Sequence, residues 1–259
     1  MSADTRLHAR AEELLRRARN GEITYTPFLT PAEQKKILTS LSFAPWEILT
    51  DGGYAAAERA RLIFLPPYLA DCDGETLDAC LAPVREETLL ALQIKGSGFR
   101  ELSHKDYLGA VLNLGIERDA IGDLCVTDTH TAVLLCDRVM AQFLCENLTR
   151  AANDAVRVER VTLPPDFDGG RKFRPLCDTV ASPRADSVVA ALAKLSRERA
   201  QALFREGLVE IDYAPADKPD QQLSAPCVIV IRGKGKFIIR SLSEQTKKGR
   251  IRLLADQYL

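Results

Sequence analysis

The stretch LSRERAQALFREGLVEID, residues 195–212, decides the fold of the C-terminal third of this chain. Ser196 is a residue type that caps helices at their start, and Gly207 stands where helices commonly end. Between them, apolar residues recur at the spacing of one helix face: Ala200, Leu203 and Phe204. The pattern predicts a short helix that packs on an apolar neighbour and runs, after the glycine, into the strand LVEID.

One flank of this helix is polar and basic. At 100° per residue, Arg197, Gln201 and Arg205 fall within about 80° of arc. Guanidiniums on one side of a docked helix can bind successive phosphates, and they stay charged at physiological pH. The alternative is that the helix arginines are ordinary solvated charges, paired with Glu198 or Glu206.

The neighbouring segments predict a compact unit around this helix. Residues 185–195 carry apolar side chains at the spacing i, i+4, i+7, which is typical of a helix. Residues 226–239 predict a longer strand that contains the basic loop Arg232–Lys236. Glycines in this loop allow close approach of the backbone to a ligand, while Lys234 and Lys236 supply positive charge.

Composition sets wide bounds on the chain. Its 259 residues are 46% hydrophobic and 27% charged, which is ordinary for globular proteins and enough for two or three compact units. No apolar run approaches the roughly 20 residues of a membrane span, and the N-terminus lacks the apolar centre of a signal peptide. We therefore expect a cytoplasmic protein with no membrane association. The seven cysteines show no C-x-x-C spacing, so we expect small buried side chains rather than disulfides or a zinc site.

Charge is distributed unevenly along the chain. The formal net charge is −1, yet residues 180–259 hold 14 Lys/Arg against 9 Asp/Glu, a net of +5, and the rest of the chain is acidic. Between Arg232 and Arg252 there are eight basic residues and one acidic residue, Glu244. A basic segment on an acidic protein is typical of polyanion binders, although a solubilising tail gives the same pattern.

The first 162 residues predict two α/β regions. A polar helix over residues 1–20, a second helix begun by Thr30 with Glu33, and strands at 46–54 and 61–67 form a small N-terminal subdomain. From residue 84 the pattern gives the order βαββαβ, the split-βαβ or ferredoxin-like arrangement. Its elements are expected at 88–96, 103–115, 122–128, 131–137, 138–151 and 155–163. An open sheet of this kind often binds RNA, and many enzymes also use it.

The expected class is therefore α+β, with the chain divided into five segments. These are an N-terminal α/β subdomain (1–70), a ferredoxin-like domain (71–162), a Pro- and Gly-rich linker (163–183), a C-terminal domain (184–240) and a basic tail (241–259).

The C-terminal domain resembles the S-four RNA-binding domain, the helix-helix-strand module also called the αL motif. The resemblance rests on Arg184-x-Asp186, Leu195-Ser196-Arg197, the helix through Gly207, and Val209-x-Ile211. The chain departs from that pattern in three places. It has Ala185 for the usual Leu, Asp212-Tyr213 for the Asn-Gly turn, and Cys227 for the Asp before the last strand.

Further motifs resemble the YlmH family, bacterial proteins with an RNA-binding domain before a C-terminal S-four domain. They are His104–Ala110, the Leu-Gly-Ile-x-Arg at 114–118, Ile121-Gly122-Asp123, the RGKGKF loop and Thr246–Arg250. Matched segments run from about Phe28 to Arg252. The resemblance implies a non-enzymatic protein that needs no cofactor and binds structured RNA on the large ribosomal subunit, rRNA and possibly tRNA, in the quality control of stalled translation.

These patterns together give an expected RNA-binding set: Lys105, Arg184, Ser196, Arg197, Arg199, Gln201, Arg205, Arg232, Lys234, Lys236, Lys247, Lys248 and Arg250. We expect a monomer, and a tail around residues 246–250 that either orders on RNA or is simply disordered.

Two other functions compete with this interpretation. S-four domains often accompany RNA-modifying enzymes, but the chain has neither the Gly-Arg-Leu-Asp context of a pseudouridine synthase nor the cofactor loop of a methyltransferase. An interaction protein of cell division is the third possibility. Ser103-His104-Lys105-Asp106 suggests a catalytic group, but a capped helix start explains it better. Nothing in the sequence favours a metal site, and Gly96-Ser97-Gly98 predicts only a turn.

Overall fold

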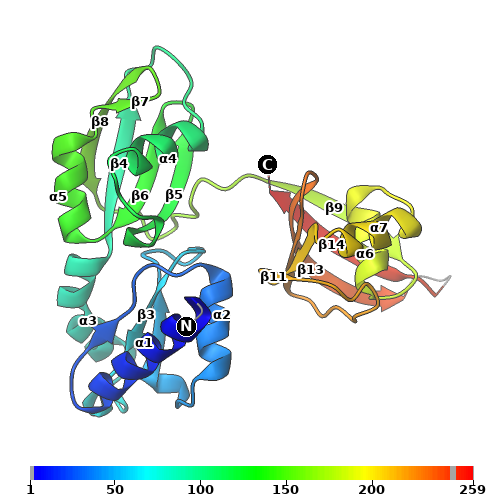
Figure 1. Ribbon diagram of the computed structural model, residues 1–259, viewed down its shortest axis with the longest axis horizontal. Helices are drawn as coiled ribbons and strands as arrows, with labels where there is room; N and C mark the ends of the chain where they lie inside the picture. The colour runs from blue at the N-terminus through cyan, green and yellow to red at the C-terminus, as the bar shows by residue number, and fades with distance from the viewer. Residues whose placement is uncertain (1–2, 246–248, 259) are drawn as a thin grey trace. The chain divides into compact units, whose positions relative to one another are not determined.

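The computed structural model describes residues 3–245 and 249–258. Within these residues the chain has seven α-helices and three antiparallel sheets, which confirms the expected α+β class (Figure 1). None of the described helices is both long and apolar enough to span a membrane. The chain divides into two compact units, unit 1 (residues 1–170) and unit 2 (residues 171–259).

The first part of unit 1 is a three-stranded sheet between helices. Its elements are α1 (Ala3–Arg19), β1 (Thr24–Tyr25), α2 (Pro31–Ser40), the 3-10 turn η1 (Pro45–Glu47), β2 (Ile48–Asp51), β3 (Arg61–Phe64) and the 3-10 turn η2 (Pro67–Leu69). The expected start of α2 is confirmed, because Thr30 and Glu33 form a reciprocal capping box. In the strand order β1-β3-β2 the central β3 is buried along its whole length. It contacts α1 and α2 on one face and α3 on the other.

Helix α3 (Gly74–Thr88) was not expected from the sequence. Asp73 caps it by accepting a hydrogen bond from the Thr76 backbone N–H at 2.7 Å. The glycine at its first position and Pro83 in its interior are both unfavourable in helices, and they obscure its pattern. Leu81 nevertheless packs beside β3, and this contact selects the helix.

The second part of unit 1 follows the βαββαβ order expected from the sequence, with one short strand added. Its elements are β4 (Leu90–Gly96), α4 (His104–Leu112), the 3-10 turn η3 (Arg118–Ala120), β5 (Ile121–Asp128), β6 (Thr131–Cys136), α5 (Arg138–Asn147), β7 (Arg150–Ala151) and β8 (Asp154–Val161). The strands lie in the order β5-β6-β4-β8-β7. Helices α4 and α5 pack on one face of this sheet, around Leu92, Ile94 and Leu134.

Asp123 joins the two parts of unit 1. Its carboxylate accepts hydrogen bonds from the Tyr54 hydroxyl at 2.7 Å and from the backbone N–H groups of Glu58 at 2.8 Å and Arg59 at 3.0 Å. At Gly122, an added Cβ would come within 2.8 Å of the ring of Phe28. Packing within unit 1 therefore accounts for the Gly122-Asp123 motif.

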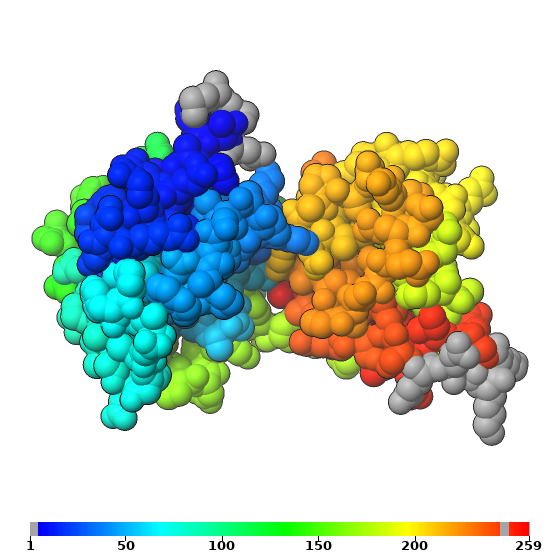
Figure 2. All heavy atoms as spheres, turned by 90° about the horizontal axis from the view of Figure 1, so that it is seen from below, coloured from blue at the N-terminus to red at the C-terminus, as the bar shows by residue number. Residues whose placement is uncertain are grey.

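Unit 2 is one sheet with a pair of helices on one face. Its elements are β9 (Phe173–Val180), α6 (Ala185–Ala193), α7 (Arg197–Arg205), β10 (Val209–Ile211), β11 (Ala214–Pro215), β12 (Cys227–Ile231), β13 (Gly235–Gln245) and β14 (Ile251–Tyr258). The strand order is β11-β10-β12-β13-β14-β9. Apolar residues of α6 and α7, including Val188 and Phe204, pack on Ile229, Ile239 and Leu253 of the sheet. In Figure 2 the helix pair (yellow) and the last strands (red) lie on opposite sides of unit 2.

The structure differs from the expected linker and tail. Within the predicted linker, residues 173–180 form β9, which pairs with β14 along its full length. Within the predicted tail, residues 251–258 form β14, which lies between β13 and β9. The prolines and glycines of residues 163–183 suggested a linker, but an edge strand tolerates Pro175 because one side of its backbone needs no partner.

The turn after β10 and the burial of the cysteines also differ in part from what the sequence predicted. The turn after β10 forms although Asp212 and Tyr213 replace Asn-Gly, and both adopt positive φ, 47° and 63°. The prediction of buried cysteines is correct for Cys125, Cys136 and Cys227 but wrong for the exposed Cys80, Cys145 and Cys177.

Candidate nucleic-acid interface

A buried carboxylate organises the start of both helices in unit 2. Asp186, with 0% of its surface exposed, lies in the first turn of α6. Arg184 donates to it through Nε and Nη2, both at 3.2 Å, and Arg197 donates at 3.0 and 3.3 Å. Gln201 adds a third donor through Nε2 at 2.8 Å. We call these four residues the Asp186 cluster.

The cluster carries a net positive charge and faces solvent. The side chains of Arg184 and Arg197 are 32% and 51% exposed. Each donates to the carboxylate through two of its three guanidinium nitrogens, so each has further donors in a fixed direction. Burial of the Asp186 carboxyl raises its pKa, but hydrogen bonds from Arg184, Gln201 and Arg197 outweigh that effect and hold the pKa below its usual range.

The remaining arginines of α7 are exposed. In the described part of the chain, no ion pair with Glu198 or Glu206 engages Arg197, Arg199 or Arg205. The simple expectation of paired surface charges is therefore not what the structure shows. Arg197 instead pairs with Asp186, a partner that the sequence analysis did not consider.

The basic β12–β13 turn lies beside the end of α7. The backbone N–H of Arg232 donates to the carbonyl of Leu208 at 2.9 Å, and Leu208 follows α7 by three residues. Arg232 and Lys234 are both exposed in this turn. The structure therefore brings the turn close to the C-terminal end of α7, where Arg205 lies.

Lys236 does not join that group. Phe237 and Ile239 face the core, so the alternating residues Lys236 and Ile238 face the other side of the sheet. There the Lys236 ammonium lies 4.8 Å from the ring centroid of Tyr213 and 4.6 Å from that of Tyr258. Lys236 therefore lies on the opposite face of the sheet from α7, and the structure does not bring all of the expected cations to one surface.

The other expected residues have local structural roles or lie elsewhere. Ser196 caps α7 by accepting a hydrogen bond from the Arg199 backbone N–H at 3.2 Å. Arg250 donates to the Thr179 carbonyl at 2.6 Å. Lys105 belongs to unit 1, on α4. Lys247 and Lys248 lie outside the described residues.

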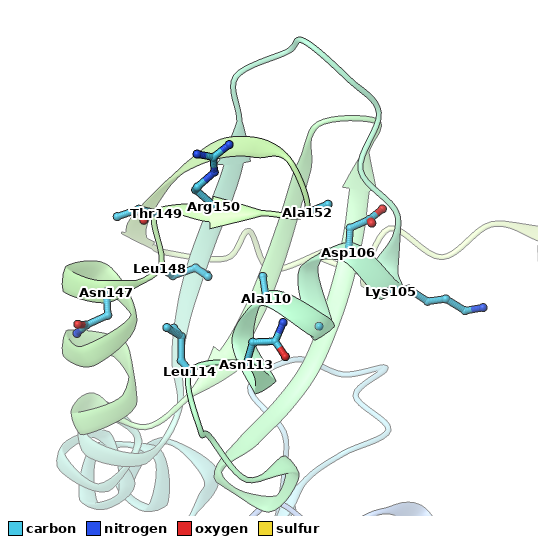
Figure 3. Close-up of a pocket in the computed structure, with 11 residues that line it drawn as sticks. Lys105, Asp106, Ala110, Asn113, Leu114, Asn147, Leu148, Thr149, Arg150 and Ala152 are labelled. Carbon is cyan, nitrogen blue, oxygen red and sulfur yellow. The ribbon is translucent and has the colours of Figure 1, made fainter.

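A pocket in unit 1 has no counterpart in the sequence analysis. It lies between α4 and β7, has a volume of about 440 Å³, and is lined by Gly109, Asn113 and Arg150 among others (Figure 3). Lys105 is also in its lining. The glycine inside a helical pattern was the sequence signal that could have indicated this site.

The stretch Ser103–Asp106 forms the start of helix α4. Ser103 and Asp106 form the expected capping box of α4, with the Asp106 carboxylate accepting from the Ser103 backbone N–H at 2.8 Å. Across residues 3–245 and 249–258, no three His, Cys, Asp or Glu side chains gather as a set that could hold a metal ion.

Two family models match the two parts of unit 1, and a known protein is similar in sequence to most of the chain. Residues 86–164 match the family described as "Putative RNA-binding domain in YlmH", and residues 8–69 match "YlmH, N-terminal". A Bacillus subtilis (strain 168) protein named "Ribosome-associated protein quality control protein P2" is 28% identical over 233 residues, which are 90% of this chain and 86% of that protein.

A solved structure, the cell division protein ylmH from Streptococcus pneumoniae, is 18% identical and covers 62% of this chain and 93% of that chain. Its TM-score of 0.45 is too low to support an inference about fold or function. The two family matches together span more than half of the sequence, and the chain therefore belongs to the YlmH family.

Proposed function

We propose that this protein is a non-enzymatic RNA-binding protein of the ribosome, which contacts large-subunit rRNA and tRNA in the quality control of stalled translation. The observation that carries the proposal is the similarity, over 90% of the chain, to a protein whose name states ribosome-associated quality control. The family description of residues 86–164 as an RNA-binding domain supports the same function.

The finer domain assignments belong to this proposal. We assign the ferredoxin-like fold to residues 71–162, supported by the antiparallel strand order β5-β6-β4-β8. We assign the S-four module to residues 184–240 of unit 2, supported by the succession of α6, α7 and β10 and by the pairing of Arg184 with Asp186.

RNA would be held mainly by the helix face of unit 2. The Asp186 carboxylate fixes the direction of the two guanidiniums of its cluster, and fixed guanidiniums bind phosphate oxygens with less loss of side-chain freedom. Arg205 extends this surface along α7, and Arg232 and Lys234 extend it beyond the helix end. Arg199 is exposed on the other flank of α7 and adds charge there. The segment around Lys247, Lys248 and Arg250 adds charge.

Sedimentation of a bacterial lysate through a sucrose gradient tests the proposal. We expect the protein to move with ribosomal subunits at low salt and to leave them at high salt. The variant Arg197→Ala/Arg205→Ala should stay at the top of the gradient. The control Arg6→Ala/Arg10→Ala removes two exposed arginines from α1 and should sediment like the unaltered protein.

Two outcomes contradict the proposal. An unaltered protein that stays at the top of the low-salt gradient would indicate an interaction protein rather than a ribosome binder. New modified bases, after incubation of the protein with ribosomal RNA and S-adenosylmethionine, would indicate an RNA-modifying enzyme.

A further inference from the structure

Gly109 has no structural reason to be a glycine. It lies inside α4, where glycine is among the least favourable residues. Its φ is not positive, and a Cβ built on it would meet no atom within 4 Å. Neither backbone conformation nor packing therefore requires it. A local preference broken without structural gain is typical of functional sites, where a bare backbone permits close approach of a ligand.

The pocket described above is lined in part by Gly109. Its apolar part includes Ala110, Leu114 and Leu148. Its volume of about 440 Å³ falls in the range of roughly 300–1,000 Å³ found for small-ligand sites. Figure 3 shows Lys105 on α4 and Arg150 on β7 at opposite sides of it.

The lining suits an anion that carries a flat, partly apolar body. Lys105 and Arg150 are exposed, and within the described residues neither takes part in an ion pair. The single acid of the lining, Asp106, accepts two hydrogen bonds from Ser103, and these hold its pKa below the usual range. Asn113 supplies an exposed amide for a base edge or a 2′-hydroxyl.

Phe99 provides a second and independent observation. It is 90% exposed, yet the loop that carries it is held at both ends. Ser97 donates to the carboxylate of Asp154 through its hydroxyl and, at 3.1 Å, through its backbone N–H. The carbonyl of Arg100 accepts from His130 Nδ1 at 2.9 Å if that nitrogen carries the proton. An exposed aromatic ring on an anchored loop is suited to stack on an unpaired base.

Phe99 and the pocket are positioned by the same hairpin. Asp154, which holds the Phe99 loop, is the first residue of β8 and pairs with Ala151 of β7. Arg150 precedes Ala151 in β7 and lines the pocket. The loop and one wall of the pocket are therefore fixed to each other through the β7–β8 hairpin.

We propose that this surface of unit 1 binds an unpaired segment of RNA. One nucleotide lies over the half-buried helix backbone at Gly109, Lys105 and Arg150 bind the phosphates on either side of it, and Phe99 stacks on a neighbouring base. The inference rests on the proposed RNA-binding function and names the site by which unit 1 takes part in it.

Binding of the full chain to two labelled RNAs tests the site: a single-stranded 12-nucleotide oligouridine and a perfect RNA duplex of equal length. Gly109→Leu fills the pocket, and because the new Cβ meets nothing and leucine favours helices, the variant should melt no lower than the unaltered protein. Gly109→Ala is the matched control, because it gains the same helix preference with one carbon. We expect Gly109→Leu to weaken single-strand binding about tenfold or more, Gly109→Ala to weaken it less, and duplex binding to stay unchanged.

Phe99→Ser should also weaken single-strand binding by about tenfold. Its control, Tyr68→Ser, removes another exposed aromatic ring and should have no effect. Single-strand affinities that stay unaltered in both Gly109→Leu and Phe99→Ser would overturn the site while leaving the proposed function intact. If Gly109→Leu and Phe99→Ser kept their single-strand affinity but no longer sedimented with ribosomes, the pocket would bind a protein partner instead of RNA. That result would also overturn the proposed RNA site. A full chain that binds neither these RNAs nor ribosomes would refute the proposed function itself.

Discussion

A substitution at Asp186 can distinguish two effects of the arginines on RNA binding, the effect of their fixed orientation and the effect of their charge. The substitution Asp186→Asn raises the net charge of the α7 surface, so long-range electrostatics alone would strengthen RNA binding. We expect weaker binding instead, by about tenfold, because Arg184 and Arg197 lose the carboxylate that fixes them. Fluorescence anisotropy with labelled ribosomal RNA measures this effect.

The control for that substitution is Asp217→Asn, which makes the same charge change at an exposed aspartate of unit 2. It should leave RNA affinity unchanged or raise it slightly. If Asp186→Asn bound RNA as tightly as Asp217→Asn, the carboxylate would have no orienting role in binding.

The same carboxylate makes the stability of unit 2 dependent on pH. Its folded-state pKa lies below the ordinary value of about 3.9. Its contribution to stability is therefore complete above about pH 4 and is lost as the pH falls toward the folded-state pKa. Urea unfolding should show Asp186→Asn less stable than the unaltered chain by about 2 kcal/mol at pH 7. The difference should shrink below pH 4, and a constant difference would contradict the assignment.

Sequence identified the residues of this cluster but not their partners. Helical spacing correctly placed Arg197 and Gln201 on one flank, since both reach the same carboxylate. It did not show that the flank faces α6, because the angle between two helices depends on core packing that a single sequence does not reveal. An aspartate on an otherwise apolar helix, such as Asp186 in ADSVVAAL, was the available signal.

At the scale of elements, the start of α7 depends on one hydroxyl. Ser196 satisfies the Arg199 backbone N–H, so Ser196→Ala should lower the free energy of unfolding by about 1 kcal/mol. Because this hydroxyl is already engaged, RNA affinity well below the melting temperature should stay unchanged. Ser224→Ala, at an exposed loop serine, is the control for stability. A large loss of RNA affinity at unaltered stability would make Ser196 a direct RNA contact.

Elements with strong local signals were predicted, and those selected by distant partners were not. The caps of α2 and α4 could be predicted because Thr30 with Glu33 and Ser103 with Asp106 act within four residues. Strand β9 could not, because β14, the strand that pairs with it among the described residues, lies 71 to 85 residues further along the chain. The candidate pocket was missed for the same reason, since α4 and β7 meet only in the folded sheet.

At the scale of the whole molecule, the two proposed sites place exposed basic residues in each unit. Residues 1–179 are net acidic, so the exposed Lys105 and Arg150 stand against the average charge of their own unit. Residues 180–259 are net basic, and long-range attraction to RNA acts mainly on this part. We infer that unit 2 drives encounter with RNA, while unit 1 selects an unpaired segment.

The salt dependence of RNA affinity tests whether both units contact the RNA. If six to eight cations meet phosphates, affinity of the full chain for ribosomal RNA should fall by roughly three to four decades over a fourfold rise in salt. Each lost phosphate contact lowers the slope of log affinity against log salt by about one. Arg197→Ala/Arg205→Ala and Lys105→Ala/Arg150→Ala should therefore each reduce the slope by about two, and the fourfold variant by about four. Arg6→Ala/Arg10→Ala should leave it unchanged. If the variant with all four substitutions reduced the slope no more than either double variant, the two units would not contact the same RNA at once. The inference that both units bind the ribosomal RNA together would then be wrong.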